Sequence, residues 1–253
     1  MYKAIFSEFL KLRRSKILLL VLIAGILPSL IKLLQSLSAK DGGKYNWQTF
    51  ISSDKEIMVL GTLITVILAS GFIFNMEYQY KTISYILTWN ISKIRIFFSK
   101  MVSIFFVIVI LLFTSFISEN LSGFIVFQTA IPADLLEMFL KVEAWYLTSY
   151  FLLSSIVAMI SVLTRKYVIT SVISLGFFML TFPFHLKDSI FICPFMTPSA
   201  VAAKIYGFNN YIFNNAYRNM DVNTVSVLAF LIILAIISTI VGLVIYKKSD
   251  APV

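Results

Sequence analysis

The sequence has little of the chemistry on which enzymes and metal proteins depend. It contains one histidine, His185, and one cysteine, Cys193. A single cysteine cannot form an internal disulfide, and one Cys with one His cannot supply the ligands of a zinc site. The sequence also has no G-x-x-x-x-G-K-[ST] phosphate loop, no H-E-x-x-H and no G-x-S-x-G. We therefore expect no enzymatic activity, no metal and no cofactor on this chain.

Charge is scarce as well. Only 13% of the 253 residues are charged, 59% are hydrophobic and the mean hydropathy is +0.92. A soluble domain carries roughly 25% charged residues, so this composition predicts an integral membrane protein. One helical crossing of the hydrocarbon layer takes about 20 apolar residues, which leaves no room for a separate soluble domain.

Six apolar runs are long enough to be helical crossings and predict an all-α membrane protein. The expected spans are residues 17–34, 57–76, 97–118, 144–164, 167–184 and 222–246. Lys32 and Lys100 are expected to extend outward to the headgroups. No Asp, Glu, Lys or Arg is expected to be buried within the runs, which disfavours a proton or ion pathway. Residues 119–143 carry four acids and one lysine and are predicted as an external loop.

Two further segments are expected to be helical without crossing. Residues 1–16 have apolar residues at helical spacing beside basic ones, which indicates an interfacial elbow helix; a signal peptide is the alternative. Residues 185–221 hold prolines and a glycine among many apolar residues, and this mixture is typical of neither a crossing nor a solvated loop. We expect an external pair of re-entrant helices there, with their backbone covered by protein.

The basic residues fix the expected orientation. With six spans, both termini, the segment 77–95 and the turn at 165–166 share one side, which holds 13 of the 21 basic residues but only Glu8, Glu77 and Asp250 among the acids. The positive-inside rule therefore places the termini in the cytoplasm. The net charge of +9 is explained by this topology, and nucleic-acid binding is not expected because no basic patch alternates with stacking aromatics.

The segment from Glu77 to Lys100 is the only well-charged stretch between two long apolar runs. As a helix it has an apolar stripe through Tyr80, Ile83 and Leu87, with a polar stripe beside it. Such a helix lies along the membrane interface or against a protein partner.

The residue order of this segment resembles the cytoplasmic loop after the second helix of ABC-2 type permeases. The resemblance rests on Glu77-Tyr78, Thr82-Ile83, Ile86-Leu87, Ile91-Ser92-Lys93, Phe97-Phe98 and Ser99-Lys100. Residues 7–16 are similar to the elbow helix of that family, and residues 197–200 fall where the family has its external re-entrant element. Tyr80-Lys81 departs from the family pattern, which often has a polar residue and Gly before the threonine.

The resemblance implies a single ABC-2 type transmembrane domain over residues 1–253, located in the bacterial plasma membrane and working as a dimer with a second permease copy or paralogue. It implies a separate ABC ATPase subunit that binds the ATP and Mg. The loop after the second span docks on that ATPase in the family, and the turn at 165–166 is a second contact. The implied coupling residues are Glu77, Tyr78, Thr82, Ile86, Leu87, Arg165 and Lys166.

Within the family the chain looks most like bacterial exporters of membrane-active peptides, including lantibiotic immunity, bacitracin resistance and phenol-soluble modulin exporters. A hydrophobic peptide would be held by aromatic and Met contacts beside membrane lipid. The candidates for the path are Phe72, Phe74, Phe177, Phe178 and Met179, whose other interpretation is lipid-facing or packing residues. The alternative functions are a non-transporting immunity or scaffold protein, and export of a lipid or polysaccharide.

Overall fold

The computed structural model describes residues 2–38, 46–52, 55–80, 92–181, 194–206 and 223–248. Within these ranges every regular element is a helix, and no strand occurs. In chain order the elements are α1 (Tyr2–Arg14), α2 (Ile17–Ser38), α3 (Trp47–Ser52), α4 (Lys55–Gln79), α6 (Lys93–Phe127), α7 (Ala133–Thr164), α8 (Tyr167–Thr181), the 3₁₀ turn η3 (Pro194–Met196), α9 (Thr197–Tyr206) and α11 (Thr224–Lys248).

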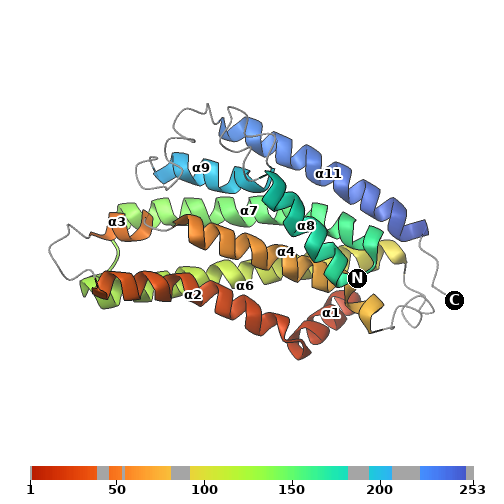
Figure 1. Ribbon diagram of the computed structural model, residues 1–253, viewed down its shortest axis with the longest axis horizontal. Helices are drawn as coiled ribbons and strands as arrows, with labels where there is room; N and C mark the ends of the chain where they lie inside the picture. The colour runs from red at the N-terminus through yellow and green to blue at the C-terminus, as the bar shows by residue number, and fades with distance from the viewer. Residues whose placement is uncertain are drawn as a thin grey trace.

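The long helices form one elongated bundle. The helices α2, α4, α6 and α7 run side by side, and α11 packs along α7 (Figure 1). Five helices in the described part are long and apolar enough to cross a membrane, namely α2, α4, α6, α7 and α11. The prediction of an all-α membrane protein is therefore confirmed, and five of the predicted spans correspond to these helices.

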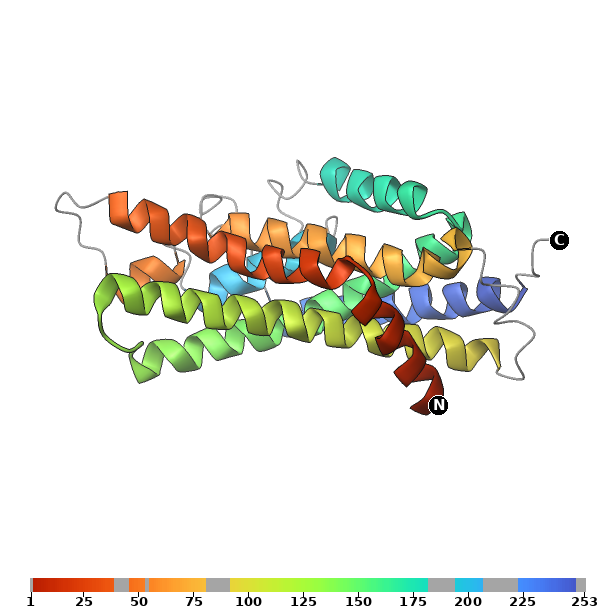
Figure 2. The same ribbon diagram turned by 90° about the horizontal axis from the view of Figure 1, so that it is seen from below.

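The sixth predicted span differs in length. Helix α8 begins at Tyr167 as expected, but its 15 residues span only about 22 Å, which is short of a hydrocarbon layer of about 30 Å. It starts at the end of the bundle where α1 lies and ends partway along it (Figures 1 and 2). The crossing of residues 167–184 therefore stays a prediction, because residues 182–193 lie outside the described part.

The predicted external loop at 119–143 is wrong. Helix α6 continues to Phe127 and α7 begins at Ala133, so most of this stretch is helical. At 1.5 Å per residue α6 is about 52 Å long and α7 about 48 Å, both far longer than one crossing. The two helices therefore form a hairpin that projects beyond the apolar layer, and its acids lie on helices rather than in a loop.

Two shorter helices lie where the sequence placed non-crossing elements. Helix α1 turns away from α2 and crosses α6 obliquely (Figure 2). Helix α9 packs on α7, where Trp145 Nε1 donates to the carbonyl of Pro198 at 3.1 Å. The interfacial role of α1 and the re-entrant path of residues 185–221 stay predictions, since most of the latter lies outside the described residues.

At the far end of the bundle α3 is seated against α6. The Trp47 ring lies directly over Gly123, so that a Cβ added there would come within 2.3 Å of Trp47 Cζ3. Trp47 Nε1 also donates to Thr129 Oγ1 at 3.2 Å, and its ring packs on Phe127 at a centroid distance of 5.2 Å. A glycine is required at this position because the indole occupies the space of any side chain.

Gly123→Ala should therefore lower the free energy of unfolding by about 1–3 kcal/mol, the usual cost of overpacking a tight contact. Thermal unfolding in mild detergent would measure the loss. Gly176→Ala is the matched control, because nothing lies within 4 Å of the Cβ that it adds, and the change from Gly to Ala favours a helix. Equal stability of the Gly123 variant and the parent protein would contradict the close approach of Trp47.

Candidate functional site

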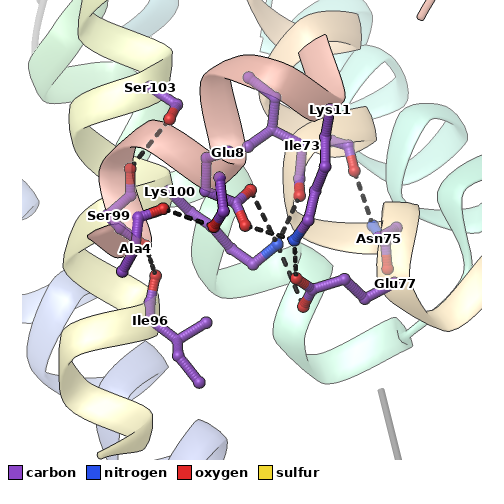
Figure 3. Close-up of polar contacts among 12 residues, drawn as sticks. Ala4, Glu8, Lys11, Ile73, Asn75, Glu77, Ile96, Ser99, Lys100 and Ser103 are labelled. Atoms are coloured by element: carbon purple, nitrogen blue, oxygen red, sulfur yellow. Dashed lines mark hydrogen bonds and ion pairs between the residues drawn. The ribbon is translucent and has the colours of Figure 1, made fainter. Parts of the chain in front are cut away.

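Four charged side chains meet where α1 crosses the ends of α4 and α6. They are Glu8 and Lys11 from α1, Glu77 from the last turns of α4, and Lys100 from the start of α6 (Figure 3). We call these four residues the charge cluster. They lie at the same end of the bundle as the turn between α7 and α8 (Figure 1).

Each carboxylate in the charge cluster contacts both lysines. Lys11 Nζ lies 2.6 Å from Glu8 Oε1 and 2.8 Å from Glu77 Oε1. Lys100 Nζ lies 3.2 Å from Glu77 Oε2 and 3.6 Å from Glu8 Oε2, and it donates to the carbonyl of Ile73 at 3.0 Å. Two cations and two anions alternate around the group, so it has no net charge.

The charge cluster is buried apart from one lysine. The side chains of Lys100, Glu77 and Glu8 are 1%, 2% and 4% exposed, whereas that of Lys11 is 33% exposed. Burial alone lowers the pKa of Lys11, but Glu77 and Glu8 raise it by more, so its pKa lies above the ordinary value. The Lys11 ammonium therefore stays charged at physiological pH and links the buried carboxylates to the surface.

This geometry corrects one expectation. Lys100 does not extend to lipid headgroups, because its ammonium is enclosed by α1 and α4. Lys11 of α1 likewise turns toward the bundle, where its ammonium donates to Glu77 Oε1 at 2.8 Å. Helix α1 exposes Phe6 and Leu10 and buries Glu8 together with Leu12 one turn later. The charge cluster therefore fixes α1 on the bundle.

A chain of hydrogen bonds runs from α4 to the turn between α7 and α8. Asn75 Nδ2 donates to Thr170 Oγ1 at 2.9 Å, and the hydroxyls of Thr170 and Thr164 lie 2.6 Å apart. Thr170 Oγ1 also donates to the carbonyl of Lys166 at 3.0 Å. Gly71 lets the helices approach, because its added Cβ would meet Thr170 Cγ2 at 3.3 Å. Helix α4 is thus joined to the 165–166 turn through Asn75, which lies two residues before Glu77.

The structure brings together some of the sequence-predicted coupling residues. Glu77 lies buried in the charge cluster, and the half-buried Tyr78 follows it. Arg165 ends α7 in the left-handed conformation with φ 53°, and Lys166 beside it is exposed. Thr82, Ile86 and Leu87 lie outside the described residues. The described candidates therefore lie at one end of the bundle, joined through Asn75 and Thr170.

The five path candidates do not share one surface. Phe74 packs inside the bundle against Phe97, with ring centroids 5.1 Å apart, and the fully buried Phe178 faces Phe195 at 6.3 Å. Phe72 is half-buried against Tyr167, with ring centroids 5.9 Å apart. Phe177 and Met179 are exposed on α8, at 42% and 57%. In this structure only these last two present a large apolar surface.

A second buried ion pair lies toward the opposite end of the bundle. Lys32 Nζ lies 2.5 Å from Glu119 Oε1, and both side chains are 2% exposed. Lys32 also donates to the carbonyls of Phe50 and Ile51 in α3, at 3.2 and 3.3 Å. The expectations that Lys32 extends outward, and that no charge is buried in the apolar runs, are therefore wrong. Pairing removes the cost that an isolated buried charge would carry.

The spacing of the two ionic sites relates them to the membrane. Lys100 and Glu119 lie 19 positions apart on α6, which is about 28 Å along the helix. That distance is close to the thickness of a hydrocarbon layer, about 30 Å. The two ionic sites are therefore separated along α6 by about the thickness of one apolar layer, which is the spacing expected of groups at its two boundaries.

The sequence did not predict the partners in the two ionic sites, namely Glu8, Lys11, Lys100, Lys32 and Glu119. The sequence did carry a signal for Lys100 and Glu119 on α6, because small side chains lie next to both of these charged residues. Lys100 is next to the buried Ser99 and one turn from Ser103, and Glu119 lies between Ser115 and Ser122. Small residues on an apolar helix mark a tightly packed face, where a charge must find a partner rather than lipid.

Comparison with known proteins supports the same class of protein. A search of curated proteins finds no match to the chain. The family model described as ABC-2 family transporter protein matches residues 4–181, which include most of α1, the charge cluster and the turn before α8. Permeases of this family are the transmembrane component of a transporter and normally work with an ABC ATPase subunit. The chain therefore belongs to the ABC-2 transporter family, as a multi-pass membrane component that is not itself catalytic.

Proposed function

We propose that the chain is the permease subunit of an ATP-driven exporter, with the end of the bundle that carries the charge cluster facing a cytoplasmic ATPase. The observation that carries the proposal is the linkage of α1, α4, α6 and the 165–166 turn by buried polar contacts. A force applied after Gln79 or at Lys166 would reach both α4 and α8. Helices α4 and α8 correspond to the second and fifth expected spans, and both would move during transport.

The proposed mechanism uses the charge cluster as a rigid joint. ATP would close two ATPase subunits, and the segments docked on them would move with them. Because Glu77 is bonded to α1 and α6, α4 would pivot on the charge cluster rather than slide along its neighbours. Helix α8 would follow through the bond from Asn75 to Thr170. In a dimer with a second permease copy or paralogue, the α4 and α8 helices would then rearrange around a central cleft.

We propose an amphipathic or antimicrobial peptide as the cargo. Phe177 and Met179 give α8 an exposed aromatic and thioether surface, and such side chains hold apolar ligands without charge pairing. Export of a lipid or polysaccharide is the alternative within the same fold. ATP hydrolysis by the purified complex should rise with amphipathic peptides and not with lipid-linked glycans; stimulation by glycans alone would contradict the peptide cargo.

The coupling proposal predicts that Arg165→Glu/Lys166→Glu loses its ATPase subunit. Both residues are in the short turn between α7 and α8, and reversing two charges at an interface costs several kcal/mol. We expect at least about tenfold less ATPase in tagged permease purified from its native membrane in mild detergent. The readouts are ATP hydrolysis in the eluate and identification of the P-loop protein by mass spectrometry.

Lys141→Glu/Lys204→Glu is the matched control, because it reverses two exposed charges outside the 165–166 turn, one in the first third of α7 and one near the end of α9. It should retain the ATPase. If the parent protein purifies without any P-loop ATPase although its function in the cell is intact, the chain is better explained as a non-transporting immunity or scaffold protein. Equal retention by both double variants would show that the 165–166 turn is not a docking point.

A further inference from the structure

An apolar groove lies between α6, α7 and α11 on the surface of the bundle. It has a volume of about 450 Å³ and is open along one side. Its walls include Phe98 and Met101 of α6, Phe151 of α7, and Ala235 and Leu243 of α11, with the hydroxyls of Ser155 and Thr239 as its polar groups. The groove needs an apolar occupant, because water in it would meet almost no hydrogen-bonding partner.

The length of the groove matches one leaflet of a bilayer. On α11 its lining extends from Leu243 back to Ile232, which is about 16 Å along the helix. A hydrocarbon layer is about 30 Å thick, so the groove covers about half of it. The groove therefore has the depth of the acyl chains of a single leaflet, beginning one turn from the end of α11 that carries Lys247 and Lys248.

The mouth of the groove is basic. Arg95 lies three residues before Phe98 on α6, and Lys247 lies four residues after Leu243 on α11, so each extends the groove-lining face of its helix. Both are exposed. Lys93 Nζ donates to the carbonyl of Lys247 at 3.0 Å, which holds the two helix ends together. The described acids at this end, Glu8 and Glu77, are paired within the charge cluster.

We infer that this groove binds an anionic phospholipid, with an acyl chain between α6 and α11 and the phosphate between Arg95 and Lys247. A basic pocket between helices at the membrane surface is the recognised setting for an anionic headgroup. The charge complementarity favours a lipid over a second copy of the chain. A two-fold contact through α11 would bring Lys247 and Lys248 of both copies together, and like charges in an interface are unfavourable.

The test is a lipid titration followed by native mass spectrometry. The delipidated, full-length chain in mild detergent is titrated with dipalmitoyl phosphatidylglycerol and, separately, with dipalmitoyl phosphatidylcholine. Arg95→Gln/Lys247→Gln should weaken phosphatidylglycerol binding about thirty-fold, at about 1 kcal/mol for each basic residue at the surface. Phosphatidylcholine binding should be weaker in the parent protein and little changed by the substitutions.

Ala235→Phe should also abolish the lipid adduct, because Ala235 is 7% exposed at the floor of the groove and a ring there fills it. Thr239→Trp on the groove wall serves the same purpose if the first variant does not fold. Arg13→Gln/Arg14→Gln on α1 is the matched control, and it should keep the parent affinity. The inference is overturned if the two double variants lose equal affinity for phosphatidylglycerol, or if the parent protein binds phosphatidylcholine as tightly as phosphatidylglycerol. It is also overturned if filling the groove changes the oligomeric state and leaves lipid binding unchanged.

Discussion

Lys100→Met should lower the free energy of unfolding of this permease by about 3–5 kcal/mol, the usual result of removing one partner from a buried ionic group. The substitution keeps a long apolar side chain but leaves Glu8 and Glu77 with Lys11 alone. One buried carboxylate charge is then uncompensated, and the carbonyl of Ile73 loses its extra donor. Thermal unfolding in mild detergent measures the effect, and Lys16→Met, at an exposed basic position nearby, should change it little.

The double variant Glu77→Gln/Lys100→Met separates lost charge balance from lost packing. It removes one anion and one cation, and the pair of Glu8 and Lys11 remains at 2.6 Å. We expect it to recover part of the stability that Lys100→Met loses, with a coupling energy of about 0.5–3 kcal/mol in the cycle. A double variant as unstable as the sum of the single variants would contradict a shared ionic group.

The same double variant tests the proposed role of the charge cluster as a joint. If the charge cluster serves only to hold α1 on the bundle, the proposed ATP-driven export should recover to the same extent as the stability. If it fixes the pivot of α4, export should stay low while the protein is folded and still retains its ATPase. Measuring stability, ATPase retention and export on one set of variants distinguishes these outcomes.

The sequence predicted the helical bundle because crossing a bilayer leaves a strong pattern. Every backbone polar group must be bonded within the segment, and about 20 apolar residues are needed. Residues 119–143 leave no such pattern and were therefore not predicted to be helical. Hydropathy marks the part of a helix that lies in lipid, whereas α6 and α7 continue as a packed hairpin beyond it. Charges there are compatible with a helix because protein and water, rather than acyl chains, surround them.

The charge cluster could be predicted only in part. The resemblance to ABC-2 permeases points to Glu77, but its partners Lys11 and Lys100 come from distant segments that meet only when α1 crosses the bundle. Lys100 lies at the start of the third apolar run, and from the sequence alone a lysine in that position is expected to extend to the headgroups. A lysine at a helix end turns toward the protein only if a carboxylate lies there to pair with it. The presence of that carboxylate depends on tertiary packing, which the local sequence does not show.

Lys32→Met should be as damaging as the change at Lys100, with an expected loss of about 3–5 kcal/mol. Lys32 pairs with the Glu119 carboxylate at 2.5 Å, and its ammonium lies 5.7 Å from the centre of the Phe50 ring. The substitution therefore takes this cation away from a carboxylate whose side chain is 2% exposed. Lys141→Met, which removes an exposed helical pair with Glu137, is the control and should cost less than about 1 kcal/mol.

Lys32→Met/Glu119→Met should regain most of the bundle's stability, because apolar replacement of a complete buried pair is often neutral or stabilising. Helix α3 should not recover with it. The carbonyls of Phe50 and Ile51 lie at the end of a six-residue helix and accept from Lys32, which also offsets the negative end of the helix dipole. Hydrogen exchange should therefore be faster at residues 47–52 of a double variant whose long helices keep the protection of the parent protein. Unchanged exchange at α3 would show that the packing of Trp47 on Gly123 suffices to hold it, and that Lys32 serves the long helices alone.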